Sequence, residues 1–239
     1  MNLIADIGNT RVKLAVFDAD TFVDQWVFDS VTRADIDSIV AKYSVDRAIV
    51  SSVGKDMNYD ELFGTLPYMV LTSEVAVPIT NRYKTPTTLG TDRLAGVVGA
   101  ATLFPDKNNL VIDMGTCITL DFITKDAEYL GGAIMPGISM KFKALHTFTN
   151  KLPLLSAENI ENIDIVGNDT WSSIYSGVMN GTCLELEGFV ARYEEKYGSI
   201  NVIFTGGDAF NFEKRVNFPN FVSSNLLLIG LNKILNTNE

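Results

Sequence analysis

The sequence predicts an α/β protein built by duplication of one structural plan. The main evidence is a pattern that occurs twice, at residues 3–10 and 110–116: an apolar run, an Asp, a hydrophobic residue, a Gly and a small polar residue. A second β-rich run follows each copy, and strands then alternate with helices, which favours sheets covered by helices. We therefore expect two similar halves, residues 1–105 and residues 106–239.

The first half begins with three short β-rich runs, which predict a meander of strands. Pro78, Pro86 and Gly90 predict that residues 73–90 form a loop. The helix that follows, from Thr91 to about residue 104, is rich in Ala and Gly, which suits close packing against another backbone. In chain order, this half is predicted to contain strands at 2–7, 11–18 and 22–28, a helix at 32–43, a strand at 46–53, a helix near 59–65 and a strand near 68–72.

The second half repeats the meander, and Pro136-Gly137 ends it. A loop containing proline is expected at 150–168, and a tight turn at residues 205–208 (TGGD). In chain order, this half is predicted to contain strands at 109–113, 117–124 and 128–135, helices near 138–148 and at 170–196, a buried strand at 201–204 and helices near 208–216 and 224–236.

Composition and charge argue against several classes of protein. The chain of 239 residues has a formal net charge of −10 and contains no run of Lys and Arg. Binding to nucleic acid or to an anionic membrane is therefore not expected. No apolar run reaches the roughly 18 residues of a membrane span, and charges near the start argue against a signal peptide. Cys117 and Cys183 form no CxxC or metal-ligand spacing, so a cytoplasmic location is expected.

The first copy of the repeated pattern carries residues suited to holding nucleotide phosphates. Asp6 offers the oxygen ligands that Mg²⁺ prefers. Gly8 lets the backbone approach phosphate oxygens, while Asn9 and Thr10 supply hydrogen-bond donors. Lys13 follows closely enough to reach a terminal phosphate.

A single hairpin of this kind is more often an ordinary β-turn, in which Asp and Gly serve turn geometry. The second copy, with Asp113, Gly115 and Thr116, favours a function, because it repeats the same residues in the same context. Two such hairpins would hold the phosphates of one nucleotide from both sides. The sequence therefore predicts a phosphotransferase.

A third element, Gly90-Thr91-Asp92-Arg93, lies where the long helix is expected to begin. Thr91 or Asp92 would serve as a helix N-cap, and an Asp near a helix N-terminus is favoured by the helix dipole. Arg93, however, is unusual in a helix of small apolar residues. The alternative is that Asp92 and Arg93 form a charged pair that binds a polar substrate and accepts its proton.

Three further features carry weaker signals. Gly206-Gly207 would let a flat ligand such as adenine lie against bare backbone, but a plain turn between a strand and a helix explains it equally well. His146, the single histidine, has no suitable partner for nucleophilic catalysis and is assigned no role. Cys117 lies in a predicted strand, where an inert thiol is the default.

Four segments resemble, in order and spacing, those of the type III pantothenate kinases: residues 6–13 (DIGNTRVK), 90–93 (GTDR), 113–116 (DMGT) and 205–207 (TGG). Residues 130–137 (LGGAIMPG) are similar to the third strand and turn of that family. The resemblance runs from residue 2 to about residue 236. The two hairpins alone would indicate only the wider superfamily of actin, sugar kinases and chaperone ATPases.

The resemblance implies an α/β fold of duplicated actin-like (ribonuclease H-like) domains, each a mixed β-sheet with a meander and flanking helices. It also implies ATP-dependent phosphorylation of the primary hydroxyl of pantothenate, which opens coenzyme A synthesis, with Asp92 as the base. Tyr83, Gly90, Thr91 and Arg93 match positions around the substrate pantothenate. The residues implied to bind ATP are Asp6, Gly8, Asn9, Thr10, Lys13, Gly115, Thr116, Gly206 and Gly207.

The same resemblance implies further ions and a second subunit. Asp6 would also hold Mg²⁺, and Asp121 resembles a residue that holds a monovalent cation, K⁺ or NH₄⁺. Thr170 resembles a residue that the other subunit of a homodimer contributes to the substrate pocket.

Three other functions stay open. A kinase for a sugar or another small alcohol would share the hairpins but would usually need a longer chain. A non-catalytic nucleotide-binding regulator would not need Asp92. Hydrolysis of a nucleotide or of polyphosphate would need a positioned water in place of a second substrate pocket.

Overall fold

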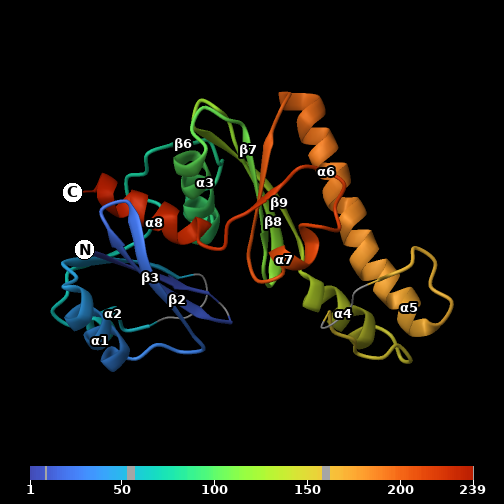
Figure 1. Ribbon diagram of the computed structural model, residues 1–239, viewed down its shortest axis with the longest axis horizontal. Coiled ribbons are helices and arrows are strands. Elements are labelled where there is room, and N and C mark those ends of the chain that lie inside the picture. Colours follow the sequence, from blue (N-terminus) through green and yellow to red (C-terminus); the bar gives the residue numbers. More distant parts are fainter. Residues whose placement is uncertain (9, 53–56, 158–161, 239) are drawn as a thin grey trace. The chain divides into compact units, whose positions relative to one another are not determined.

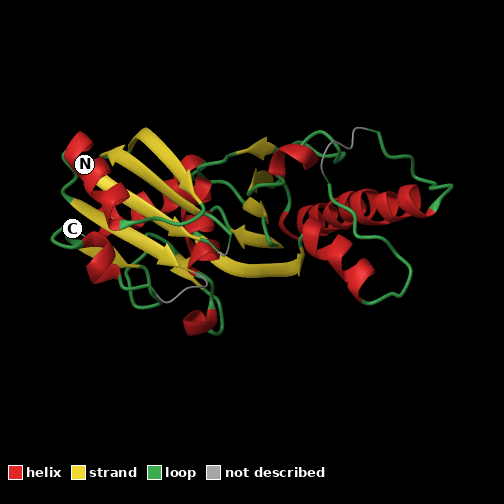
Figure 2. Ribbon diagram, turned by 90° about the horizontal axis from the view of Figure 1, so that it is seen from below, coloured by secondary structure: helices red, strands yellow, loops and turns green. Residues whose placement is uncertain are grey.

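The computed structural model describes residues 1–8, 10–52, 57–157 and 162–238. Its strands form two sheets, of five and six strands, with helices against them (Figures 1 and 2). This confirms the predicted α/β class with a three-strand run at the start of each half. Asn9, a predicted phosphate-binding residue, and Val53, the last residue of a predicted strand, lie outside the described residues. Within the described ranges, no helix has the length and apolar character needed to cross a membrane.

The first sheet has the strand order β3-β2-β1-β4-β5. Strands β1 to β3 form the predicted antiparallel meander, whereas β4 and β5 add in parallel to β1, so the sheet is mixed. Its strands are β1 (Asn2–Ile7), β2 (Val12–Asp18), β3 (Thr21–Phe28), β4 (Arg47–Ser52) and β5 (Tyr68–Val70).

The second sheet has the strand order β11-β10-β7-β8-β9-β6. Strands β7 to β9 repeat the three-strand run, and β6 pairs in parallel with β9. Its strands are β6 (Thr80–Asn81), β7 (Asn109–Met114), β8 (Cys117–Ile123), β9 (Glu128–Pro136), β10 (Asn201–Thr205) and β11 (Phe221–Val222).

The helices lie between and after these strands. Two of them are not ordinary α-helices: η1 is a 3₁₀ turn, and η2 is a π-helical segment between α5 and α6. The helices are α1 (Arg33–Tyr43), α2 (Tyr59–Phe63), η1 (Pro86–Thr88), α3 (Thr91–Leu103), α4 (Ile138–Thr147), α5 (Thr170–Tyr175), η2 (Ser176–Asn180), α6 (Gly181–Tyr197), α7 (Ala209–Phe212) and α8 (Leu226–Thr237).

The chain packs as two compact units, each discontinuous in sequence. The first unit comprises residues 1–109, 121–131 and 225–239, and the second comprises residues 110–120 and 132–224. The C-terminal helix α8 therefore packs with the N-terminal residues. The predicted halves, 1–105 and 106–239, are the two copies of the proposed duplication and differ from these packing units. The division into halves stays a prediction.

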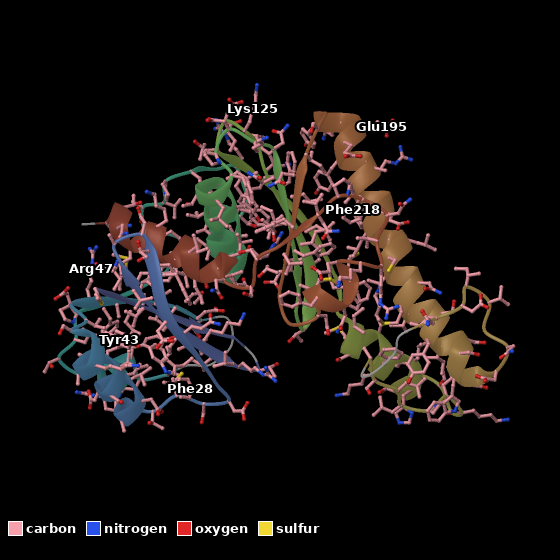
Figure 3. All side chains as sticks on the ribbon, in the orientation of Figure 1. Phe28, Tyr43, Arg47, Lys125, Glu195 and Phe218 are labelled. Carbon is pink, nitrogen blue, oxygen red and sulfur yellow. The ribbon has the colours of Figure 1, made fainter. Side chains whose placement is uncertain are left out.

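The first unit buries side chains on both faces of its sheet, because strand β1 alternates between two cores. Leu3, Ala5 and Ile7 pack toward α1 and α2, whereas Ile4 packs toward α3 and α8. Phe28 and Tyr43, labelled in Figure 3, complete the first of these cores from β3 and α1. A strand covered on both faces needs the near-continuous apolar run that the sequence has at this position.

The two helices α3 and α8 approach each other at their backbones (Figure 1). A Cβ atom added to Gly230 would lie 1.9 Å from the carbonyl oxygen of Ala95, and one added to Gly99 would lie 2.2 Å from that of Leu226. Both sites therefore require glycine. The contact confirms the expectation that the small residues of α3 face another backbone.

A buried polar network fastens the C-terminal helix to the start of the chain. The Asn2 side-chain amide donates hydrogen bonds to Asn232 Oδ1 (2.8 Å) and Asn236 Oδ1 (2.7 Å). Arg47, labelled in Figure 3, donates to Asn2 Oδ1 and Asn236 Oδ1, each at 3.0 Å. Because buried amides are costly without partners, this network fixes the position of α8 along β1 and β4.

The structure differs from the predicted elements mainly where they are short. Strands β6 and β11 have two residues each, too few for a period in the sequence. The helix predicted at 170–196 contains the π-helical turn η2. The helix predicted at 208–216 is helical only over α7, because turns follow it.

We expect Gly230→Ala to lower the free energy of unfolding by about 1–3 kcal/mol, because the added methyl group would collide with the Ala95 carbonyl. The measurement is the midpoint of urea unfolding, followed by circular dichroism. Gly188→Ala on α6 is the matched control, since a Cβ there meets nothing within 4 Å. That change should instead stabilise the chain by about 0.5–1 kcal/mol. Equal midpoints for the two variants would contradict the close helix contact.

Candidate active site

The first hairpin places Asp6 near the end of β1, where β1 lies between β2 and β4. Asp6 is paired in register with Lys13 on β2 and with Ser51 on β4. The Gly8 N–H donates to the Arg11 carbonyl oxygen at 3.0 Å and closes the turn. Thr10 is exposed and Lys13 half-buried. Asn9, predicted to bind phosphate, lies outside the described residues.

The fold disfavours the ionised form of the Asp6 carboxylate. It is only 9% exposed, and burial raises the pKa of its carboxyl to about 6. Lys13 opposes this rise in pKa, and the negative charge of Asp92 adds to it. The predicted metal ligand and the predicted base, which are far apart in sequence, therefore interact electrostatically.

The Gly90–Arg93 element forms the N-terminus of α3. Gly90 itself is the N-cap, so neither Thr91 nor Asp92 has the capping role that the sequence allowed. A Cβ at Gly90 would lie 2.4 Å from Asp92 Oδ1, which shows that Asp92 folds back over the cap. Asp92 Oδ1 accepts a hydrogen bond from the Arg93 N–H at 2.8 Å.

A contact of the neighbouring Thr91 and the pKa of Asp92 itself describe the surroundings of Asp92. The hydroxyl groups of Thr91 and Ser51 lie 2.9 Å apart, which ties the start of α3 to β4 beside Asp6. Burial raises the pKa of Asp92, and the nearby Asp121 carboxylate adds to the rise, whereas the Arg93 N–H and guanidinium oppose it. A half-buried carboxylate with a raised pKa is suited to accepting a proton.

Arg93 does not point into solvent but pairs with Asp121 of β8. Its Nε donates to Asp121 Oδ1 and Oδ2 at 3.0 and 3.1 Å, and its Nη2 donates to Oδ1 at 2.6 Å. The Tyr129 hydroxyl of β9 also donates to Asp121 Oδ1, at 2.6 Å. Tyr83 stacks on Tyr129 with ring centroids 6.1 Å apart, and the Arg93 Cζ lies 5.6 Å from the Tyr83 ring.

The second hairpin repeats the closure of the first. The Gly115 N–H donates to the Cys117 carbonyl oxygen at 3.0 Å, as Gly8 does to Arg11. Gly137 packs against this turn, because a Cβ there would lie 2.4 Å from the carbonyl oxygens of Gly115 and Thr116. The sequence repeat thus corresponds to the same backbone device in both copies, with a turn one residue shorter in the second.

The Gly206-Gly207 turn lies against the same hairpin within the second unit. Gly206 has a φ of +89°, and a Cβ there would lie 2.5 Å from Asp113 Oδ1. The Asp208 N–H donates to the Met114 carbonyl oxygen at 3.0 Å. Gly207 instead has nothing within 4 Å of its Cβ position. Gly206 is therefore required by packing, whereas Gly207 leaves space beside the backbone.

Thr170 begins α5 and is exposed, next to the N-cap Asp169. His146 Nδ1 lies 2.8 Å from the Leu152 carbonyl oxygen in the loop after α4, so it has a local structural contact. Residues beside the candidate site that the sequence did not single out are Ser51 and Tyr129. Neither carries a local signal, because each lies within an ordinary strand.

Comparison with known proteins identifies the family. The family profile described as "Type III pantothenate kinase" matches residues 2–192. The chain belongs to the type III pantothenate kinase family. The predicted family is thus confirmed, and with it a kinase of coenzyme A synthesis.

Full-length relatives support this assignment. A type III pantothenate kinase from Cytophaga hutchinsonii is 44% identical over 238 residues and covers 100% of both chains. One from Bacteroides fragilis is 43% identical over 244 residues, covering 100% of this chain and 99% of the relative.

Solved structures share the fold at lower identity. A protein from Campylobacter jejuni, described as a conserved putative Baf family transcriptional activator, has a TM-score of 0.65 and 22% identity, covering 99% of this chain and 98% of its own. A glucokinase from an Antarctic psychrotroph has a TM-score of 0.53 and 15% identity, covering 100% and 99%. These likenesses confirm the predicted fold class of actin-like ATPases and sugar kinases, and at such identities they show the fold alone.

We expect Asp6→Asn to stabilise the nucleotide-free kinase at pH 7–8 in EDTA by about 2–3 kcal/mol, while activity is lost. The folded pKa of about 6 lies above the ordinary value of 3.8, so the folded chain binds the proton more tightly than the unfolded chain does. Stability contributed by protonated Asp6 is therefore full below pH 4 and lost as the pH rises through 6. Unfolding midpoints of parent and variant from pH 4 to 8 test this, and parallel curves would contradict it.

Proposed function

We propose that this kinase transfers the γ-phosphoryl group of ATP to the primary hydroxyl of pantothenate, with Asp92 accepting the hydroxyl proton. The observation that carries the assignment is the position of Asp92. It is half-buried at the N-terminus of α3, its pKa is raised, and it adjoins Arg93, whose guanidinium is held by Asp121. A base and a fixed cation side by side suit a substrate that has both a hydroxyl and a carboxylate.

Several residues would hold the nucleotide. Gly8, Asn9, Thr10 and Lys13 of the first hairpin would donate hydrogen bonds or charge to its phosphates. Gly115 and Thr116 of the second hairpin would donate to phosphates, and Gly206-Gly207 would offer bare backbone to adenine. The space beside Gly207 supports that last assignment.

The site fits a magnesium ion at Asp6. Within the described residues, no cluster of three or more His, Cys, Asp or Glu side chains could form a complete protein-made metal cage. Mg²⁺ in kinases usually takes one or two carboxylates, with phosphates and waters as its other ligands. Asp6 is one buried carboxylate with an unfavourable charge, and the ion would offset that charge together with charge on the phosphates.

The monovalent cation fits less well at its predicted ligand. Asp121 is 1% exposed, and its two oxygens already accept hydrogen bonds from Arg93 and Tyr129. We therefore derive no step through K⁺ or NH₄⁺ at Asp121. A role for such an ion stays a prediction.

Direct in-line transfer demands positioning and charge stabilisation more than covalent chemistry from the protein. Tyr83, Gly90, Thr91 and Arg93 would orient pantothenate so that its hydroxyl meets Asp92. Lys13 would sit beside the transferring group. These local cations must attract two anionic substrates to a chain of net charge −10.

We expect Asp92→Asn to fold normally but to lose about 10²–10⁴-fold in turnover, the usual contribution of a positioned base. ATP-dependent formation of phosphopantothenate is the measurement, with KM for both substrates recorded. Asp106→Asn is the matched control, because Asp106 is an exposed carboxylate with a left-handed backbone (φ 58°) that Asn tolerates. Near-parental turnover of Asp92→Asn would remove Asp92 from the role.

The second part of the proposal is a homodimer in which Thr170 completes the pocket of the other subunit. Support comes from exposed apolar side chains in the second unit. On α5 and η2, Ile174 and Val178 are core residues, but Trp171 is 58% exposed. Other exposed apolar residues of this unit include Phe148, Leu154, Ile165, Val166 and Leu184.

We expect Trp171→Glu to convert the dimer into an inactive monomer, because buried aromatic residues dominate such interfaces. Light scattering coupled to size exclusion gives the mass, and the kinase assay gives the activity. Phe210→Glu on α7 is the control, since Phe210 is a similarly exposed aromatic residue (61%) on another helix. A monomer with parental activity would contradict the shared pocket.

A further inference from the structure

Four residues from separate elements of the first unit form one cluster, in which Tyr83 is half-buried and the other three are buried. Arg93 comes from α3, Asp121 from β8, Tyr129 from β9 and Tyr83 from the segment between β6 and η1. We propose that Asp121 and Tyr129 are positioning residues that fix the Arg93 guanidinium, and that selection of a carboxylate-bearing substrate depends on them. The proposal rests on the proposed function, in which Arg93 binds the pantothenate carboxylate.

The geometry of the pair decides which edge of the guanidinium meets a ligand. Asp121 takes the edge formed by Nε and Nη2. A guanidinium has a second edge, formed by Nη1 and Nη2, which can hold a carboxylate with two parallel hydrogen bonds. Anchoring one edge on Asp121 therefore aims the other in a fixed direction.

The cluster contributes direction more than charge. Arg93 and Asp121 together are formally neutral, and both side chains are almost fully buried, at 8% and 2% exposed. A buried ion pair of this kind gains little net stability from its attraction, since both ions lose water. What it fixes is the orientation of the donor group that the substrate meets.

The two tyrosines hold the pair in place. Tyr129 is fully buried, and its hydroxyl hydrogen bond to Oδ1 restrains the Asp121 carboxylate. Tyr83 lies parallel to the Tyr129 ring, at an interplanar angle of 6°, and beside the Arg93 guanidinium. Gly131, with φ +99°, makes room for this stack, because a Cβ there would lie 3.2 Å from the Tyr83 ring.

The experiment compares Asp121→Asn, Tyr129→Phe and the parent on two substrates. One is pantothenate, and the other is its primary amide, which keeps the reacting hydroxyl but has no carboxylate. Values of kcat and KM are measured for each at saturating MgATP, with K⁺ titrated separately. Glu128→Gln is the matched control. Glu128 precedes Tyr129 in the chain and accepts hydrogen bonds from Arg82 Nε and Nη2, so this change breaks a similar Arg–carboxylate pair that is exposed.

We expect Asp121→Asn to raise the KM for pantothenate about tenfold or more, with kcat within about threefold of the parent. Tyr129→Phe should act in the same direction by a smaller factor, since it removes one donor and keeps the ring. Neither variant should change the KM for the amide, so the preference for the carboxylate shrinks. Both variants should keep the K⁺ requirement of the parent. The control Glu128→Gln should match the parent in kcat and KM for both substrates.

Two results would overturn the proposal. One is an equal loss on pantothenate and on its amide. The other is a changed K⁺ requirement with the carboxylate preference intact, which would return Asp121 to the cation. If a thermal melt shows that Asp121→Asn does not fold, Tyr129→Phe decides the question. The quantity compared is again the change in KM for pantothenate relative to the change for the amide. A parent enzyme that phosphorylates the amide but not pantothenate would overturn the proposed function itself.

Discussion

The burial of negative charge is the constraint on which the rest of the first unit depends. Asp6, Asp92 and Asp121 come from β1, α3 and β8 and act on one another electrostatically along the series. Only Asp121 has a complete cationic partner, in Arg93. Asp6 and Asp92 keep raised pKa values, so the fold disfavours the ionised form of both carboxylates. A bound cation would offset that cost. Such an arrangement costs stability and is typical of functional sites.

The position of α3 makes this arrangement possible. Its N-terminus carries Asp92 and Arg93, while Gly99 further along the helix packs on α8, backbone against backbone. Helix α8 is in turn fastened to β1 and β4 by the buried Asn2 network. The core therefore sets where Asp92 lies relative to Asp6 on β1, and a shift of α3 along its axis would separate the two carboxylates.

The fold alone does not choose the reaction. The same chain path occurs in a glucokinase and in a protein described as a transcriptional activator, each under 25% identical. The Asp-x-Gly hairpins suit nucleotide phosphates in general. In this chain the Gly90–Arg93 element places a carboxylate with a raised pKa and an anchored guanidinium at one helix end, beside Tyr83 and Tyr129.

The sequence by itself determined the α/β class, the duplicated hairpins and the identity of most candidate residues. Apolar runs and glycine turns are local signals in the sequence. The prediction was stronger because the same pattern of these signals occurs twice. The sequence could not pair Asp121 with Arg93, bring Ser51 to Thr91, or bury Tyr129 beneath Tyr83, since these partners lie on different strands and helices. It also missed the two-residue strands and the π-helical turn. Only the tertiary structure decided these features, because burial and hydrogen bonding between distant segments leave no period in a single chain.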